Sequence, residues 1–241
     1  MTTSATPSAL TSLTGDGQHT LTPTVGTKFY KDGCAKTFPG NTIICHVPRP
    51  SMTFDALVQL QEALKTSPHV DHFSYLPASS FHMTVSEGVT NGNRACTHWP
   101  QDMPLDASVE DVTAHMVDKL RGLTLPTSFK VRPTSLGGAR TIGLEPANAS
   151  EEKKLRDTRN KLADVLNLRT PHHDAYGFHI TLAYLIRYLS PEDAQTVLDK
   201  AELAYEEFVK CVPEIELEAL EFCTFNDMTA FEPQLILGQT S

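Results

Sequence analysis

Apolar and polar positions along the chain follow two periods, which predict short strands alternating with amphipathic helices. The β-branched run from Thr42 to Val47 is typical of a strand, and apolar positions over 54–64 recur at helical spacing. The stretch FHMTVSEGV, residues 81–89, predicts the next strand. Further along, the same criteria predict helices over 109–120, 150–166 and 190–210, and strands over 128–134, 140–145, 178–186, 214–225 and 230–237.

Capping and turn residues indicate where these elements begin and end. The last three helices are predicted to start at residues with capping side chains: Ser108 (with Asp111), Ser150, and Ser190 (before Pro191). Gly137 and Gly138 predict a hairpin, and residues 226–229 predict a second hairpin near the end of the chain. A long polar loop over residues 88–107 separates the first histidine strand from the following helix.

One five-residue pattern, aromatic, His, aliphatic, Thr and aliphatic, occurs twice, as FHMTV from Phe81 and as FHITL from Phe178. Each copy follows a strand containing Thr-Ile and then a helix, at nearly the same distance along the chain. This correspondence predicts two similar lobes related by a pseudo-twofold axis, with the two motif strands near their interface. We expect residues 28–241 to form this single bilobal domain.

Composition limits the classes of function. The 241 residues are 40% hydrophobic, enough for a substantial core, and carry a formal net charge of -9. An acidic chain is not expected to bind long DNA or RNA through its whole surface, whereas a small anion can bind in a local basic cleft. The five cysteines form no C-x-x-C pair of the kind that indicates zinc or thiol redox chemistry. We expect a monomer with reduced cysteines.

The first 27 residues are rich in Thr, Ser, Gly and Pro and contain no Lys or Arg before Lys28. They lack the continuous apolar segment of a secretory signal and the arginines of a transit peptide. We therefore expect a disordered tail over residues 1–27 and a cytoplasmic protein, with a nuclear location as the alternative. No run approaches the ~18 apolar residues that a transmembrane helix needs, so no membrane contact is expected.

The repeated motif places chemically useful side chains on one face of a strand. Because side chains alternate, His82 and Thr84 point one way and Met83 points the other. His179 and Thr181 share a face in the same manner. Either motif alone would be compatible with an ordinary half-buried strand, since threonine favours strands and a histidine finds a backbone partner. Two copies in matched contexts favour a shared site.

Two histidines that face one cleft from opposite lobes suit an in-line displacement at phosphorus. One neutral imidazole accepts the proton of an attacking water, and the other, as imidazolium, donates a proton to the departing oxygen. Each threonine hydroxyl can donate to a non-bridging phosphate oxygen. This scheme requires no metal or cofactor. A 2',3'-cyclic phosphate of a nucleotide, an RNA end or a related small molecule is its natural substrate.

The two His-x-Thr motifs resemble the signature of the 2H phosphoesterase superfamily, which includes RNA 2',3'-cyclic phosphodiesterases. The stretches PGNTIICHV and FHMTVSEGV, and the loop with Arg94 and Trp99, resemble an uncharacterised bacterial and fungal branch of it. The resemblance implies an α+β fold in which two mainly antiparallel sheets flank a central cleft, with helices outside. It also implies a 2'-phosphate product, with His82 as the acid toward the leaving O3' and His179 as the base.

Two other functions are compatible with the same residues. A protein of this kind could cleave or join 2',5'-linked nucleotides with the same histidine pair. It could also bind a nucleotide or an RNA end without turnover, although retention of all four motif residues argues against this alternative.

Three further residues are candidates for substrate binding. Arg94 could pair with a phosphate, with a solvated loop arginine as the alternative. Trp99 could stack on a nucleobase or anchor its loop on the core. Arg187 shares the face of His179 and Tyr184 does not, so Arg187 is the better candidate for contacting a phosphate or a ribose.

Two clusters contain residue types that bind metals, at 69–72 (HVDH) and 172–174 (HHD). Both lie in turn-like segments after helices, and neither has a recognised ligand spacing. We expect these residues to be capping or solvated groups and predict no metal site.

Overall fold

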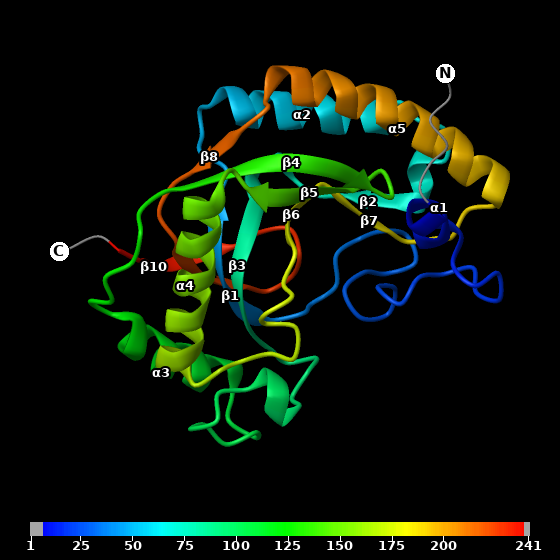
Figure 1. Ribbon diagram of the computed structural model, residues 1–241. Coiled ribbons are helices and arrows are strands. Elements are labelled where there is room, and N and C mark those ends of the chain that lie inside the picture. Colours follow the sequence, from blue (N-terminus) through cyan, green and yellow to red (C-terminus); the bar gives the residue numbers. More distant parts are fainter. Residues whose placement is uncertain (1–6, 239–241) are drawn as a thin grey trace.

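Eight antiparallel strands form one sheet in the computed structural model, which describes residues 7–238 (Figure 1). The order is β10-β9-β1-β3-β6-β5-β4-β8. These strands are β1 (Gly40–His46), β3 (His82–Thr90), β4 (Phe129–Gly137), β5 (Thr141–Pro146), β6 (Phe178–Thr181), β8 (Ile215–Leu217), β9 (Glu221–Phe225) and β10 (Glu232–Ile236). A second sheet pairs β2 (Phe73–Tyr75) with β7 (Ala183–Leu185).

The strand order is symmetric about the junction of β3 and β6. Counting outward, β3, β1, β9 and β10 on one side correspond to β6, β5, β4 and β8 on the other. This arrangement confirms the α+β class and the pseudo-twofold duplication. The two sheets expected from the sequence are halves of one sheet, because Met83 of β3 pairs with Ile180 of β6.

The helices pack in pairs. Their bounds are α1 (Pro7–Thr14), α2 (Met52–Lys65), α3 (Val109–Leu120), α4 (Ala149–Leu166) and α5 (Pro191–Cys211). Figure 1 shows α2 beside α5, while α3 lies against α4, which also packs on β3, β4 and β5. Leu155 and Leu162 of α4 are fully buried, as the helical spacing predicts. None of the helices over residues 7–238 is long and apolar enough to cross a membrane.

Predicted helix starts are confirmed at two of three positions. Ser108 accepts a hydrogen bond from the Asp111 amide, and Ser190 caps α5 in the same way. The start of α4 differs from the prediction, because Asn148 accepts from the amides of Ser150 and the next residue. Ser150 therefore lies in the first turn.

Residues 7–27 are ordered, so the predicted disordered tail is wrong over that range; residues 1–6 lie outside the described residues. Leu13 of α1 is fully buried. The Thr22 amide donates to the Ile186 carbonyl at 3.0 Å, and the Thr22 hydroxyl donates to the Leu185 carbonyl at 2.6 Å. The Ser and Thr content that indicated disorder instead supplies hydroxyls to the backbone beside β7.

Two predicted strands are interrupted. The run over 178–186 breaks at Leu182, whose amide donates to the Arg140 carbonyl and whose carbonyl accepts from Leu76. As a result, β6 belongs to the large sheet and β7 to the small one. The run over 214–225 divides into β8, which pairs with β4, and β9, which pairs with β1 and with β10. The predicted closing hairpin is thus β9 and β10.

Candidate active site

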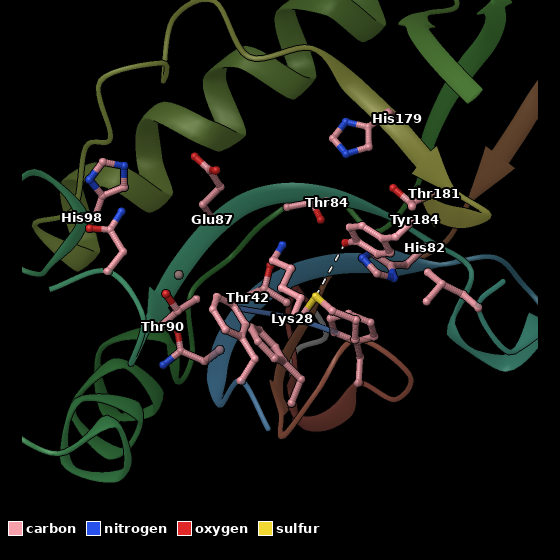
Figure 2. Close-up of a pocket in the computed structure, with 18 of the residues that line it drawn as sticks. Lys28, Thr42, His82, Thr84, Glu87, Thr90, His98, His179, Thr181 and Tyr184 are labelled. Atoms are coloured by element: carbon pink, nitrogen blue, oxygen red, sulfur yellow. Dashed lines mark hydrogen bonds between the residues drawn. The ribbon is translucent and has the colours of Figure 1, made fainter. Parts of the chain in front are cut away.

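The central strand pair brings the two His-x-Thr motifs together. Met83 and Ile180 are fully buried and pair directly, so counting one residue along each antiparallel strand sets His82 opposite Thr181. The same count sets Thr84 opposite His179. All four motif side chains line one cavity of about 430 Å³ and gather at one end of it (Figure 2).

Both imidazoles are held by the same local contact. Nδ1 of His82 lies 2.7 Å from the Ser80 carbonyl oxygen, and Nδ1 of His179 lies 3.0 Å from that of Gly177. A carbonyl can only accept, so each Nδ1 carries the hydrogen. The neutral form of either ring therefore has its lone pair on Nε2. Each histidine lies two residues after the residue whose carbonyl holds its Nδ1. In both histidines Nε2 is therefore the nitrogen available for proton transfer.

The environment of His82 disfavours its charged form. The ring of Phe231 lies 4.3 Å from the His82 ring, centroid to centroid. Burial, above all, lowers the pKa of His82 to about 4, and the nearby charges of His46 and His179 act in the same direction. The Ser80 hydrogen bond opposes this shift only in part. At neutral pH His82 is therefore an uncharged imidazole.

His46, Glu221 and Cys223 form the one group of metal-ligating types that comes together among residues 7–238, with ligand atoms within 4.8 Å of one another. Nδ1 of His46 lies 3.0 Å from a Glu221 carboxylate oxygen. Burial raises the pKa of the Cys223 thiol, which disfavours the thiolate that a metal would require. These residues fit a His46–Glu221 contact beside a buried thiol better than a metal site.

The sequence clusters at 69–72 and 172–174 do not converge on a shared point. His69 contacts Asp193 at 3.2 Å, and Nδ1 of His72 contacts the Arg187 carbonyl. His173 bonds to Asn160, whereas Asp174 pairs with Arg169. The residues act as separate surface and loop contacts.

Two tyrosines complete the wall of the cavity. Burial raises the pKa of Tyr176 to about 12, and the nearby Thr84 side chain opposes this shift only in part. The Tyr176 ring lies over the guanidinium of Arg159, 4.2 Å from centroid to Cζ. Burial also raises the pKa of Tyr184 to about 12, and its hydroxyl contacts the sulfur of Met228 at 3.6 Å. Both phenols remain protonated and can donate.

Sequence reasoning missed Tyr184 for a structural reason. Continuous alternation from His179 would turn its side chain to the opposite face. The break at Leu182 ends the alternation, and Tyr184 lines the same cavity as His82 and Thr181 (Figure 2).

Lys28 brings positive charge to the cavity. Its ammonium lies 5.3 Å from the ring centroids of Phe38 and Tyr184, and no carboxylate among residues 7–238 forms an ion pair with it. Burial lowers the pKa of Lys28, while the charge of Glu87 raises it. Glu87 is the sole acidic residue in the described lining of this cavity. The half-buried lysine is therefore suited to an anion.

The three sequence candidates for substrate binding lie outside the cavity lining. Arg94 donates to Asn91 and to two carbonyls of its own loop, and it stacks on Trp99. Trp99 is 1% exposed and donates from its indole nitrogen to Pro104. These contacts stabilise the 88–107 loop. Arg187 follows the end of β7 and contacts Asp71 and a carbonyl of Lys31, away from His179.

Comparisons with known proteins indicate the family of the chain. Residues 28–141 match a family model named 2H-phosphodiest, described as a domain of unknown function (DUF1868). The fold is similar to the crystal structure of a conserved protein of unknown function, ATU0111, from Agrobacterium tumefaciens str. C58, at 31% identity and a TM-score of 0.89. That similarity covers 95% of this chain and 98% of the other. No curated protein matches. The chain belongs to the 2H phosphodiesterase family.

Proposed function

We propose that the protein hydrolyses a 2',3'-cyclic phosphodiester of a nucleotide or RNA end to the phosphomonoester, without a metal ion. One observation carries this proposal: both His-x-Thr motifs lie on neighbouring strands and line one cavity, with each Nδ1 held by a carbonyl and each Nε2 without a hydrogen bond among residues 7–238. A phosphate between them has a proton acceptor on one side and a proton donor on the other.

The step is a single displacement at phosphorus. Nε2 of one histidine takes a proton from water as the water oxygen bonds to phosphorus. The bond from phosphorus to the sugar O3' breaks, and Nε2–H of the other histidine protonates O3'. The product is a 2'-phosphate with a free 3'-hydroxyl, and the two imidazoles then exchange protons with solvent. Thr84, Thr181 and the ammonium of Lys28 stabilise the charge on the non-bridging oxygens.

The low pKa of His82 supports its assignment as the base, since an uncharged imidazole accepts a proton at neutral pH. Protonation of the leaving oxygen then belongs to His179. This assignment is the reverse of the one that the family resemblance implies.

The rest of the cavity supports a nucleotide-sized substrate. Figure 2 shows Glu87, Thr90 and His98 at the end away from the histidine pair. Their polar groups, with the side-chain amide of Asn93, can hydrogen-bond to a base or sugar. A volume of about 430 Å³ falls in the usual range for small-molecule sites.

Incubation with the four nucleoside 2',3'-cyclic phosphates, with and without EDTA, tests the proposal. We expect turnover that survives EDTA and yields 2'-phosphates. His82→Ala and His179→Ala should each lose roughly 10²- to 10⁴-fold in rate. His19→Ala is the matched control, because His19 is an exposed histidine outside the cavity. If no cyclic phosphate is hydrolysed, whether mononucleotide or oligonucleotide, the proposal fails. Turnover confined to 2',5'-linked nucleotides, or binding without turnover, would select one of the other two functions.

The roles of the two histidines are separated by a substrate with an activated leaving group, such as a p-nitrophenyl phosphodiester. Nitrophenolate needs no proton from an acid, so the variant lacking the acid should regain most of its lost rate. We expect this recovery in His179→Ala and not in His82→Ala. The opposite pattern would make His82 the acid.

A further inference from the structure

A second cavity, of about 440 Å³, adjoins the first. The two share Lys28, His179, Thr181 and Tyr184 in their linings. Beyond these residues, the second cavity is lined by the N-terminal segment, including Ser12 and residues 22–24, and by Arg140 and Tyr188. It therefore lies on the side of the His179 motif that faces away from Glu87 and His98.

The turn between β4 and β5 determines the conformation of the Arg140 side chain. Gly138 and Ala139 have positive φ values of 54° and 57°. A Cβ at Gly138 would lie 2.2 Å from Nη1 of Arg140, so only glycine lets the guanidinium fold back over the turn. Nη1 donates to the Gly138 carbonyl at 3.1 Å. This leaves most of the guanidinium donors without a partner among the bonds described for residues 7–238.

The charges in this cavity are of one sign. Its described lining contains two cations, Lys28 and Arg140, and no carboxylate. Burial lowers the pKa of both groups, and neither forms an ion pair with a carboxylate among residues 7–238. Partly buried charges are ordinarily paired, because desolvation disfavours them. In a chain with a net charge of -9, two such cations in one cavity point to an anionic ligand.

Several hydroxyls in the lining are already engaged. The hydroxyls of Thr22 and Thr24 both donate to the Leu185 carbonyl, at 2.6 and 3.0 Å. These hydrogen bonds attach the N-terminal segment to β7, so that the segment forms one side of the second cavity. The guanidinium of Arg140 and the ammonium of Lys28 are thus the principal donors toward a ligand, and a guanidinium matches two phosphate oxygens at once.

We propose that this cavity binds a second phosphate of the same substrate, so that the preferred substrate is a 2',3'-cyclic phosphate bearing a further phosphate group. This inference rests on the proposed function. Lys28, which lines both cavities, faces both phosphates, while Arg140 contacts the second one alone. The further phosphate is either a 5'-phosphate on the same nucleoside or the diester linkage to the preceding nucleotide of an RNA end.

The test compares kcat/KM for three substrates: a nucleoside 2',3'-cyclic phosphate with a 5'-hydroxyl, the same compound with a 5'-phosphate, and a dinucleotide ending in the cyclic phosphate. We expect the second or the third to exceed the first by roughly 10-fold or more, as for a charge-assisted hydrogen bond. The larger of the two preferences identifies the source of the phosphate. Equal values for all three would overturn the inference while leaving the proposed function intact.

Arg140→Gln should reduce the ratio of kcat/KM between substrates with and without the further phosphate toward one. Arg140→Lys should keep part of this preference. Arg132→Gln, at an exposed arginine on β4 outside both cavities, should keep the wild-type preference. Melting temperatures confirm that each variant is folded. A preference unchanged in a folded Arg140→Gln variant would remove Arg140 from the site and contradict the inference.

A binding measurement separates this inference from the proposed function. Calorimetry compares adenosine 2',5'-bisphosphate with adenosine 2'-monophosphate, which require no turnover. Tighter binding of the bisphosphate by the wild type, lost in Arg140→Gln, would support the second subsite even if no cyclic phosphate were hydrolysed. Equal affinities in the wild type would refute it even if hydrolysis were observed.

Discussion

His82 is the residue whose chemistry depends most on its surroundings. Phe231, from the segment that precedes β10, covers its ring, and the His46 ring lies 6.2 Å away on the neighbouring strand. The pKa of His82 is thereby lowered, whereas an exposed histidine titrates near neutral pH. Nε2 of His82 therefore stays unprotonated well into the acidic range.

The pH profile tests this account. The kcat/KM of the wild type should fall on the acidic side only as the pH approaches about 4, where the free His82 base becomes protonated. His46→Asn removes a charge that lowers the pKa of His82, and it leaves the Glu221 carboxylate, which raises it. The acidic limb of the variant should therefore move to higher pH. An acidic limb at the wild-type pH in His46→Asn would contradict the effect of the His46 charge on His82. His19→Asn is the control and should leave the profile unchanged.

Lys28 illustrates a conflict between stability and binding. Its ammonium is half-buried without a carboxylate partner among residues 7–238, an arrangement that disfavours the folded state but suits an anionic substrate. Lys28→Met should lower kcat/KM by roughly 10- to 100-fold, because a charge-assisted contact with phosphate is lost. Its melting temperature should be unchanged or higher.

Lys36→Met is the matched control, because Lys36 also lies over an aromatic ring but donates to the Gly26 carbonyl at an exposed position. It should retain wild-type activity. A clear fall in the melting temperature of Lys28→Met, with unchanged kcat/KM, would show that Lys28 serves the fold instead.

At the scale of elements, strand alternation was a reliable guide only within one strand. It correctly paired His82 with Thr84 and His179 with Thr181, and both pairs line the cavity. It failed at Tyr184, because alternation cannot reveal a break that moves the chain from one sheet to another. Arg94 and Trp99 were attractive by residue type, but their partners lie inside their own loop, and a single sequence does not show such contacts.

The N-terminal segment shows the same limit. Low hydrophobicity over residues 1–27 favoured disorder, yet a few residues such as Leu13 and Thr22 attach residues 7–27 to β7 and α5. This N-terminal segment is held by contacts with β7 and α5, which lie far from it in the sequence. Local composition does not report such contacts.

Deletion of residues 1–27 should therefore affect both stability and activity. Loss of buried side chains such as Leu13 should lower the melting temperature by roughly 5 °C or more. The preference for a second phosphate should also disappear, since one wall of the second cavity is removed. Leu13→Ala should reproduce part of the stability loss, whereas Leu203→Ala, at an exposed leucine, should not. A truncated protein with the wild-type melting temperature and substrate preference would refute this role.

At the scale of the whole molecule, each half of the sheet contains strands from distant parts of the chain. The half with β1 and β3 is completed by β9 and β10 from the C-terminal end, while β4 crosses into the other half. The pseudo-twofold relation of the repeats was readable from the two motifs. The exchange of outer strands was not, because the apolar pattern of a strand does not show which other strand it pairs with.

A chain ending at Leu220 tests how far the halves depend on each other. It lacks β9 and β10, which leaves one edge of β1 unpaired and removes Phe231 from His82. We expect no cooperative unfolding transition and a tendency to aggregate, measured by circular dichroism and gel filtration. A folded, monomeric truncated chain would indicate that the remaining six strands of the large sheet are stable without β9 and β10.

The pairing of β1 with β9, which lies far from it in the sequence, has a consequence during protein synthesis. While the chain is still attached to the ribosome, β1 and β3 can pair with each other, but the strand that covers the other edge of β1 has not yet emerged. Nor has Phe231, whose ring lies against His82. The nascent protein therefore cannot acquire the desolvated histidine until residues 221–231 have left the ribosome, and we expect no hydrolysis before that point.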